Sequence, residues 1–433
     1  MKKYEILYQK YKDDILNGYL VKGDRLPSIR QACTLYKVSQ TTAEHAYNKL
    51  QDDGFIVSVP KVGYIVDCTH QQILLRKQIE EAKDINVPTS YQYDFQTTAV
   101  FNDENEMNLI RRYSRYVFDR IDVLSSYGDP QGEIELREAL SKYAYRNRGV
   151  LSTPDQIVIG ASFQSLLYLL CGMLDKTQTI AVPNDCSKHT LQVFKAYGFF
   201  IVYLDPDHLL EDLKKADCQI LYINSACFGS LKRPISANDR YALLSYTGSK
   251  DILLIEDDYN GELTYASKNR NAIQAYAQKD HVVYCGSFSR LLVPSMRLSY
   301  MVLPKSLSNR FQKEKANISP TASKLEQLTF SAYIVDGYLD KHLRRLKKEY
   351  RIRYKEFEKI LQKYFIDYYL NEAYMSYVIL LPGVNLDKLR TLCEAHSIGI
   401  TLRNESIEIS FAAIDKELMS KGISLLAKLI KEC

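Results

Sequence analysis

The first 66 residues show apolar positions spaced three and four residues apart, interrupted by turn residues. This spacing predicts three helices, the second starting at Ser28 and the third at Ser39, a residue type that favours the N-cap position. The run GFIVSVPKVGYIV then holds two β-rich stretches around Pro60–Gly63, which predicts a hairpin. Three helices followed by a hairpin are typical of a winged helix-turn-helix, which we expect over residues 1–66.

From residue 96 to residue 433, short apolar runs alternate with helical patterns. The strand candidates are Ile157–Gly160, Thr179–Val182, Phe199–Leu204, Ile220–Ile223, Ile252–Ile255, Val282–Cys285 and Leu298–Leu303. Such alternation predicts an α/β domain with a mainly parallel sheet and helices on both faces, whose ligands bind at the carboxyl ends of the strands. We expect a long charged helix from about Tyr333 to Lys363 and a small α+β subdomain from about residue 365 to residue 433.

Residues 67–95 are polar and are expected to form a linker between the two domains. A short helical pattern over Gln71–Lys83 belongs either to this linker or to the second domain.

The composition indicates in which compartment the protein is found and which kinds of site it lacks. Nine cysteines without any C-x-x-C pair argue for a reducing compartment and against a disulfide framework or a zinc ribbon. Seven scattered histidines without an H-x-x-x-H pair predict no metal site. We expect a cytoplasmic protein that makes no membrane contact, because there is no basic and apolar leader and no apolar run of about 18 residues.

The N-terminal region has features that suit nucleic acid. Its 66 residues carry ten Lys/Arg against seven Asp/Glu, which leaves a net charge of +3. The third predicted helix starts with Gln40, Thr41 and Thr42, and a polar helix start of this kind can enter the major groove and contact base edges. Lys61 in the hairpin turn is placed to neutralise a phosphate. The alternative is a winged helix used for protein contacts alone.

The segment GDRLPSIRQACTLYKVSQTTAEHAYNKLQDDGFIVSVPKVGYIV resembles the DNA-binding domain of the GntR family of bacterial regulators. The resemblance implies a double-stranded DNA operator as partner. It assigns to DNA contact the residues Arg30, Ser39, Gln40, Thr41, Thr42, Lys61 and Gly63. The family often has arginine where this chain has Gln40, and glutamine prefers adenine where arginine prefers guanine. We therefore expect an operator that differs from common family sites.

Four motifs of the second region stand in the order and approximate spacing of fold-type I aminotransferases: YGDPQGEIELREAL, IVIGASFQSLLYLL, LLIEDDYNGEL and GSFSRLLVPSMRLSY. Together with the N-terminal region they resemble the MocR subgroup of GntR regulators, in which a winged helix is fused to an aminotransferase-like domain. The resemblance implies a homodimer with a pocket at the subunit interface. A dimer presents two winged helices to two DNA half-sites.

The resemblance also implies a pyridoxal phosphate site, part of which is kept. Asp257 corresponds to the partner of the pyridine nitrogen, and Tyr259 to the donor to the ring oxygen. Their spacing of two at a strand end puts both side chains on one face. Positions that bind the phosphate, or that begin a helix suited to an anion, are matched by Ser162, Phe163, Ser287, Ser289 and Arg297.

Other positions depart from the aminotransferase pattern. Arg290 stands where a lysine forms the Schiff base, and a guanidinium stays protonated and offers no free amine to an aldehyde. The stretch AVPNDCSKH lacks the aromatic that stacks on the cofactor, and INSACFGSLKRP lacks the family's Pro-x-His-Gln. Glu408 replaces the arginine that holds the substrate carboxylate, and we expect it to repel such a group. Four departures at one pocket argue against transamination.

Three hypotheses remain open for the second domain. In the first, it binds no cofactor, and Arg290 forms a buried ion pair with Asp257. In the second, its pocket holds pyridoxal phosphate or another anionic small molecule noncovalently. In the third, the chain is an active aminotransferase that uses another lysine. We expect a transcription regulator with no covalent cofactor, whose aminotransferase-like domain dimerises and senses a small-molecule effector.

Overall fold

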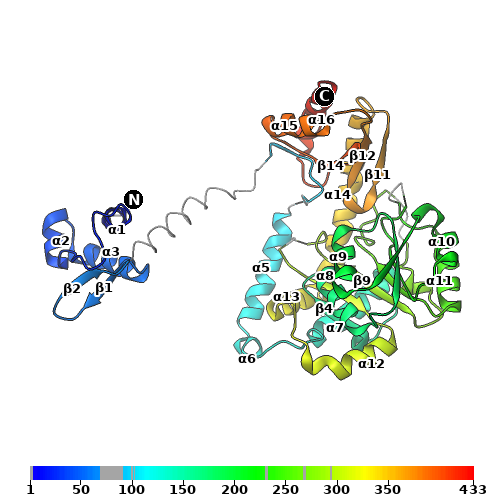
Figure 1. Cartoon of the computed structure of the whole chain (residues 1–433), viewed down its shortest axis with the longest axis horizontal. Helices are drawn as coiled ribbons and strands as arrows, with labels where there is room; N and C mark the ends of the chain where they lie inside the picture. The colour runs from blue at the N-terminus through cyan, green and yellow to red at the C-terminus, as the bar shows by residue number, and fades with distance from the viewer. Residues whose placement is uncertain are drawn as a thin grey trace. The chain divides into compact units, whose positions relative to one another are not determined.

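The computed structural model describes residues 3–68, 91–98, 101, 103–229, 233–266, 270–292 and 295–433 (Figure 1). The chain divides into two compact units, Met1–Thr89 and Ser90–Cys433. The helix predicted over Gln71–Lys83 lies outside the described residues. Within the described ranges, each helix is too short or too polar to cross a lipid bilayer.

The first unit has the predicted winged helix-turn-helix fold. Its elements are α1 (Lys3–Leu16), α2 (Ile29–Tyr36), α3 (Gln40–Asp52), β1 (Ile56–Val59) and β2 (Gly63–Val66). Ser28 and Ser39 cap α2 and α3, as their hydroxyl oxygens accept hydrogen bonds from backbone N–H groups of the first turn. Tyr11 of α1 and Tyr47 of α3 are buried in one shared core. The three-and-four spacing of apolar residues thus predicted the packed faces correctly.

A seven-stranded sheet forms the centre of the second unit. Its strands are β4 (Ile157–Gly160), β5 (Thr179–Pro183), β6 (Phe200–Leu204), β7 (Ile220–Asn224), β8 (Leu253–Asp257), β9 (Val282–Ser287) and β10 (Ser299–Val302). Their order is β4-β10-β9-β8-β7-β5-β6, with β10 antiparallel to both neighbours and the other pairs parallel. The predicted mainly parallel sheet is confirmed, and the carboxyl ends of β5, β7, β8 and β9 share one edge.

Helices cover both faces of this sheet. The helices of this part of the second unit are α5 (Glu104–Phe118), α6 (Ile121–Leu124), α7 (Ile134–Arg148), α8 (Phe163–Met173), α9 (Lys188–Tyr197), α10 (Leu209–Lys215), α11 (Ala237–Ser249), α12 (Lys305–Glu314), α13 (Lys324–Val335) and α14 (Tyr338–Leu361). Neighbouring residues of β10 enter different cores: Tyr300 packs in the core shared with α7 and α13, and Met301 in the core shared with α8 and α9. This alternation follows from the twofold period of a strand.

The prediction of one long charged helix from about Tyr333 to Lys363 is wrong in one respect. The structure has two helices here, because α13 ends at Val335 and α14 begins at Tyr338. Gly337 separates them with a φ of 75°, a left-handed conformation that glycine adopts without steric cost.

The C-terminal subdomain has an antiparallel sheet in the order β11-β12-β15-β14. Its elements are β11 (Tyr368–Asn371), β12 (Ser376–Leu380), α15 (Leu386–Ala395), β13 (Ile398–Gly399), β14 (Thr401–Arg403), β15 (Ser406–Ser410) and α16 (Lys416–Lys431). Strand β3 (Tyr93–Asp94) pairs in parallel with β13, and Phe95 is fully buried against Phe357 of α14. Residues 93–95, expected to end the linker, therefore belong to the packed second unit.

Candidate functional site

The start of α3 presents polar groups on the first unit. The Ser39 hydroxyl caps the helix by accepting from the backbone N–H of Thr42 at 3.3 Å, and it also lies 3.0 Å from the Thr41 hydroxyl and 2.7 Å from the Thr42 hydroxyl. Gln40 and Thr41 are exposed. The Gln40 amide Nε2 donates to Glu44 Oε1 at 2.8 Å, one turn further along the helix. This bond orients the Gln40 amide at the helix end.

The remaining residues expected at DNA are also on the surface of this unit. Arg30 is exposed on α2. Lys61 is exposed in the turn between β1 and β2, Gly63 is exposed at the start of β2, and both have positive φ, 65° for Lys61 and 108° for Gly63. A lysine in this conformation is uncommon, and it places a cation at the tip of the wing.

The second unit contains a cavity of about 1190 Å³ at the carboxyl ends of β5, β7, β8 and β9. The small C-terminal subdomain supplies its opposite wall through residues of β11, β12, β14 and β15. Eight of the nine residues expected at a cofactor-like pocket line it: Ser162, Phe163, Asp257, Tyr259, Ser287, Ser289, Arg297 and Glu408. Parallel strands bring these sequence-distant residues together because their ends meet at one sheet edge.

Asp257, the last residue of β8, accepts a hydrogen bond from the Tyr222 hydroxyl at 2.8 Å. Burial raises the pKa of Asp257 to about 7, and the charges of Asp258 and Glu256 add to the rise, although the bond from Tyr222 opposes it. Tyr259 lines the same cavity, as its spacing from Asp257 predicted. A carboxyl group with this pKa can take or release a proton near neutral pH.

Arg290, the ninth expected residue, does not form the predicted ion pair with Asp257. It is only 7% exposed, and its Nε donates to the Tyr259 hydroxyl at 3.1 Å, while its guanidinium lies 5.8 Å from the centre of the Tyr374 ring. Its Nη1 has no hydrogen-bond partner among the described residues. The prediction fails because Tyr222 holds Asp257 and Tyr259 holds Arg290, so the two charges are kept apart.

The serines at the carboxyl end of β9 form a small hydroxyl cluster. The Ser287 hydroxyl lies 3.2 Å from that of Ser289 and accepts from Ser299 at 3.3 Å. Arg297 has an exposed side chain in the wall beside them. Ser162 uses its oxygen to cap α8 by accepting from the backbone N–H of Ser165 at 3.1 Å. Ser162 is thus a cap, while the β9 hydroxyls and Arg297 are placed to bind an anion.

Glu408 does not stand as an unpaired anion in the cavity, contrary to the expected repulsion. Its Oε2 accepts from Arg403 at 3.1 Å from Nε and 2.7 Å from Nη2. Its Oε1 accepts from Asn371 at 2.9 Å and from Ser376 at 2.7 Å. A carboxylate with four donors and a paired cation presents little negative charge to a ligand.

Several residues that line the cavity were not predicted from the sequence: Lys188, His189, Tyr222, Asn371, Tyr374 and Arg403. Tyr222 lies near the end of a recognised strand, so its strand position was a usable signal. Arg403 and Glu408 lie on the two strands of one hairpin, and a predicted hairpin would have placed them diagonally across from each other. Asn371 and Tyr374 reach the cavity only through packing of the small subdomain, which no local pattern indicates.

The residues of the cavity fit pyridoxal phosphate only in part. Asp257, Tyr259, the β9 serines and Arg297 offer the donors and the carboxylate that such a phosphorylated pyridine needs. The amine that would bond its aldehyde is missing at position 290, since arginine cannot supply one. The side chains present suit an anionic ligand held without a covalent bond.

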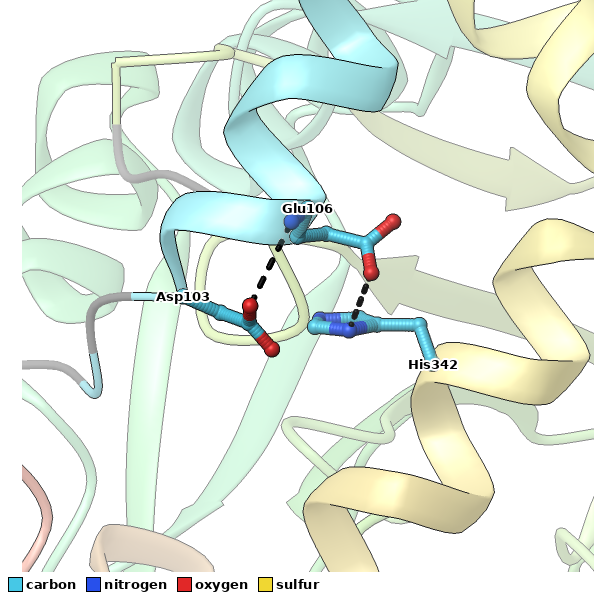
Figure 2. Close-up of side chains that lie close together, drawn as sticks. All are labelled: Asp103, Glu106 and His342. Carbon is cyan, nitrogen blue, oxygen red and sulfur yellow. Dashed lines mark hydrogen bonds and ion pairs between the residues drawn. The ribbon is translucent and has the colours of Figure 1, made fainter.

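A cluster of Asp103, Glu106 and His342 has the residue types of a metal site (Figure 2). His342 Nδ1 lies 2.9 Å from Glu106 Oε2. Arg345 Nη2 lies 2.6 Å from Asp103 and 2.5 Å from Glu106, so that a guanidinium already neutralises both carboxylates. Burial raises the pKa of Glu106, but hydrogen bonds from His342 and Tyr333 and the charge of Arg345 outweigh it and hold this pKa below its usual range. We interpret the cluster as an ion-pair network joining α5 to α14.

Both parts of the chain match known protein families. A model described as "Bacterial regulatory proteins, gntR family" matches residues 3–66, and one described as "Aminotransferase class I and II" matches residues 89–426. The uncharacterized HTH-type transcriptional regulator YdeL of Bacillus subtilis is 30% identical over 366 residues, which cover 80% of this chain and 76% of that protein. The probable rhizopine catabolism regulatory protein MocR of Rhizobium meliloti is 25% identical, with 97% of this chain and 92% of that protein covered.

The fold of the second unit recurs in solved aminotransferases. The kynurenine aminotransferase of Pyrococcus horikoshii superposes with a TM-score of 0.68 at 20% identity, covering 83% of this chain and 94% of that one. A multiple substrate aminotransferase of Thermococcus profundus gives a TM-score of 0.68 at 21% identity, with 82% and 94% covered. Similarity at this level of identity shows a shared fold.

Proposed function

Since the chain belongs to the GntR-type helix-turn-helix transcriptional regulators that carry an aminotransferase class I and II domain, we propose that it binds a DNA operator and has no aminotransferase activity. One observation carries this proposal. The same chain joins an exposed, polar start of α3 to a cavity beside which Arg290 stands at the position of the Schiff-base lysine.

The DNA contacts follow from the surface of the first unit. Gln40 and Thr41 at the start of α3 read base edges in the major groove, where the free N–H groups of the first turn also favour a phosphate. Arg30 and Lys61 neutralise phosphates on either side. Because the operator is double-stranded DNA, a homodimer with two first units would bind two half-sites. We place the protein in the cytoplasm, where the operator is accessible.

The absence of transamination rests on the chemistry of position 290. A nucleophilic amine must lose its proton to attack an aldehyde, and lysine can do so when its pKa is lowered. Arginine stays protonated, and Arg290 also donates to Tyr259, which keeps its head group turned to that hydroxyl. Lys188 lines the cavity, so the alternative of an enzyme that uses another lysine has a specific candidate.

The cavity is proposed to hold an effector without a covalent bond. Its anion donors and the neutral-range pKa of Asp257 support pyridoxal phosphate or another small anionic molecule. Such a ligand would alter DNA binding only by favouring one of two arrangements of the dimer.

The operator hypothesis is tested with fluorescence anisotropy on the DNA upstream of the protein's own gene. Arg30→Ala should weaken binding about tenfold, which corresponds to ~1.4 kcal/mol, because one phosphate contact is lost. Arg390→Ala is the matched control, since it removes an exposed arginine of α15 in the second unit. Equal affinity of wild type and Arg30→Ala, or loss of affinity in Arg390→Ala as well, would argue against the docking described above.

A further inference from the structure

The second unit contains a smaller pocket, the arginine pocket, which shares no lining residue with the cavity described above. It lies among the loops that follow β7, β8 and β11, beside the end of α7 and near the start of α11. Its polar lining residues are Arg148, Arg240, Asn260, Thr264, Arg270 and Glu372. Three arginines in one small pocket repel one another unless anions lie beside them.

The charge of Arg148 is balanced within the protein. Its Nε and Nη2 donate to the two carboxylate oxygens of Asp258, at 2.6 and 2.9 Å, and Asp258 is fully buried. Its Nη1 donates to the carbonyl oxygens of Gly261, at 3.0 Å, and of Arg270. Arg148 therefore forms part of the wall of the arginine pocket and keeps few donors for a ligand.

Arg240 is buried without an ion pair. Only 4% of it is exposed, its Nε donates to the carbonyl oxygen of Ile235 at 3.2 Å, and its Nη1 donates to that of Asn271. Within the described ranges it has no carboxylate at ion-pair distance, and its Nη2 makes no hydrogen bond. Because a guanidinium keeps its charge when buried, Arg240 calls for an anionic partner at Nη2.

Glu256 does not serve as this partner. Its charge acts on Arg240 from a longer distance and opposes the lowering of the Arg240 pKa that burial causes. The Glu256 carboxylate itself accepts from the backbone N–H groups of Ile273 and Gln274 and from the Ser225 hydroxyl. These three donors hold it away from the guanidinium.

Arg270 adds a second cation without an ion pair among the described residues. Its side chain is exposed, and its Nη1 lies 3.3 Å from the carbonyl oxygen of Ile235. Glu372 is the one acidic residue among the described lining, and its Oε1 accepts from two backbone N–H groups at 2.8 Å. Three arginines against Glu372 and the Asp258 that pairs with Arg148 leave one positive charge.

Asn260 gives the pocket an acceptor that needs a donor. It is 3% exposed, and its Nδ2 donates to the carbonyl oxygen of Ala373 at 2.8 Å. Its Oδ1 has no hydrogen-bond partner in the part of the chain that the structure describes. A simple halide would satisfy Arg240 and leave this oxygen unpaired, whereas an anion with its own O–H group satisfies both.

The size of the arginine pocket limits the ligand further. Its volume is about 20 Å³, against about 1190 Å³ for the first cavity. A pocket of this size admits a small ion and excludes an organic effector.

We propose that the arginine pocket binds a small inorganic oxyanion that carries a hydroxyl group, of the size of bicarbonate. Arg240 and Arg270 donate to its charged oxygens, and its O–H group donates to Asn260 Oδ1. This site goes beyond the proposed function, because it uses none of the residues of the first cavity or of the DNA-binding surface.

The test uses isotope-labelled bicarbonate and the full-length protein at mildly alkaline pH. The NMR line broadening of bicarbonate gives its dissociation constant, and competition by nitrate gives that of a planar anion of the same charge without an O–H group. Wild type should bind bicarbonate in a saturable way and several-fold more tightly than nitrate. Arg240→Gln should weaken bicarbonate binding about tenfold, since a hydrogen bond to a charged group is lost.

Three further variants make the test specific. Arg270→Gln alters an exposed side chain, so it should fold like wild type and weaken binding several-fold even if Arg240→Gln does not fold. Asn260→Gly suits the backbone φ of 58° at this position and should abolish the preference for bicarbonate over nitrate. Arg390→Ala, at an exposed arginine of α15, should leave both constants unchanged.

Three outcomes would overturn the inference. The first is bicarbonate binding by Arg270→Gln and by folded Arg240→Gln that equals that of wild type. The second is equal affinity of wild type for bicarbonate and nitrate. The third is binding that survives these substitutions and disappears in Arg297→Ala, which would assign the anion to the first cavity.

Discussion

At the scale of single residues, position 290 determines what chemistry the cavity can perform. Arginine and lysine both carry one positive charge, but only lysine can release a proton from its head group under conditions that a protein can create. In this structure the Arg290 guanidinium is buried and donates to Tyr259. The substitution keeps a cation beside the cavity and removes the nucleophile.

Asp257 is a desolvated carboxyl group that has no paired cation among the described residues, and this raises its pKa and makes its contribution to stability depend on pH. Burial raises its pKa to about 7, well above the value near 4 that an unfolded chain gives. Between these two values the folded state keeps the proton and the unfolded state loses it. The contribution of Asp257 to the free energy of unfolding therefore falls as pH rises from about 4 to about 7, and stays low above that.

Asp257→Asn should remove this pH dependence. The free energy of unfolding of the variant minus that of wild type should increase by about 2 kcal/mol between pH 5 and pH 8, because each pKa unit is worth ~1.4 kcal/mol and the cavity admits some water. Urea denaturation at the two pH values measures it. Asp119→Asn, at an exposed carboxylate, is the control. A difference that stays constant with pH would show that Asp257 is already ionised at pH 5.

At the scale of elements, the start of α3 and the β14–β15 hairpin use the same device. In each, a glutamate carboxylate accepts hydrogen bonds from some of the N–H groups of a neighbouring polar side chain. The other polar groups of that side chain stay without a bond to the glutamate. Glu44 accepts one N–H of the Gln40 amide, and the second N–H and the carbonyl oxygen remain. This remaining pair matches the donor and acceptor pattern of adenine in the major groove.

Gln40→Arg should change base preference rather than general DNA affinity. Arginine pairs with guanine, so selection from a randomised operator library should move the contacted position from adenine to guanine, with a discrimination of ~1–3 kcal/mol. Gln40→Ala serves as the comparison and should lose the preference without gaining a new one. The same selected sequences for all three proteins would place Gln40 away from the bases.

At the scale of the whole molecule, a DNA-binding unit and an aminotransferase-like unit are joined in one chain, each with its own core. The second unit keeps a large cavity although arginine stands at the position of the Schiff-base lysine. This combination agrees with the proposed regulatory role of the full-length protein.

Full-length wild type incubated with pyridoxal phosphate and then with borohydride should give no covalent adduct by mass spectrometry, since no amine stands at position 290. Arg290→Lys should give one adduct, on the new lysine, if the cavity has kept its shape. Lys188→Ala in the wild-type background is the control for the alternative amine. An adduct on wild type that disappears in Lys188→Ala, together with amino transfer above the rate of free cofactor, would restore the enzyme hypothesis.

Much of the fold was predictable from local patterns. The spacing of Leu7, Tyr11 and Ile15 predicts the buried face of α1, and the capping serines predict where α2 and α3 begin. Short apolar runs predict the strands of the central sheet within two residues at either end. The motifs around Asp257 and Ser287 also predict which strand ends face the cavity. These features depend on residues close together in sequence.

Partnerships between distant residues required the folded chain. Sequence reasoning paired Arg290 with Asp257 and left Glu408 alone, whereas the structure joins Arg290 to Tyr259, Asp257 to Tyr222 and Glu408 to Arg403. The wall that brings Asn371 and Tyr374 to the cavity comes from a separate subdomain. Periodicity and motifs predict which side chains of each helix or strand are buried. The partner of a buried charge depends on which side chains the packed segments bring within about 3 Å of it, and that is decided only when the layers come together.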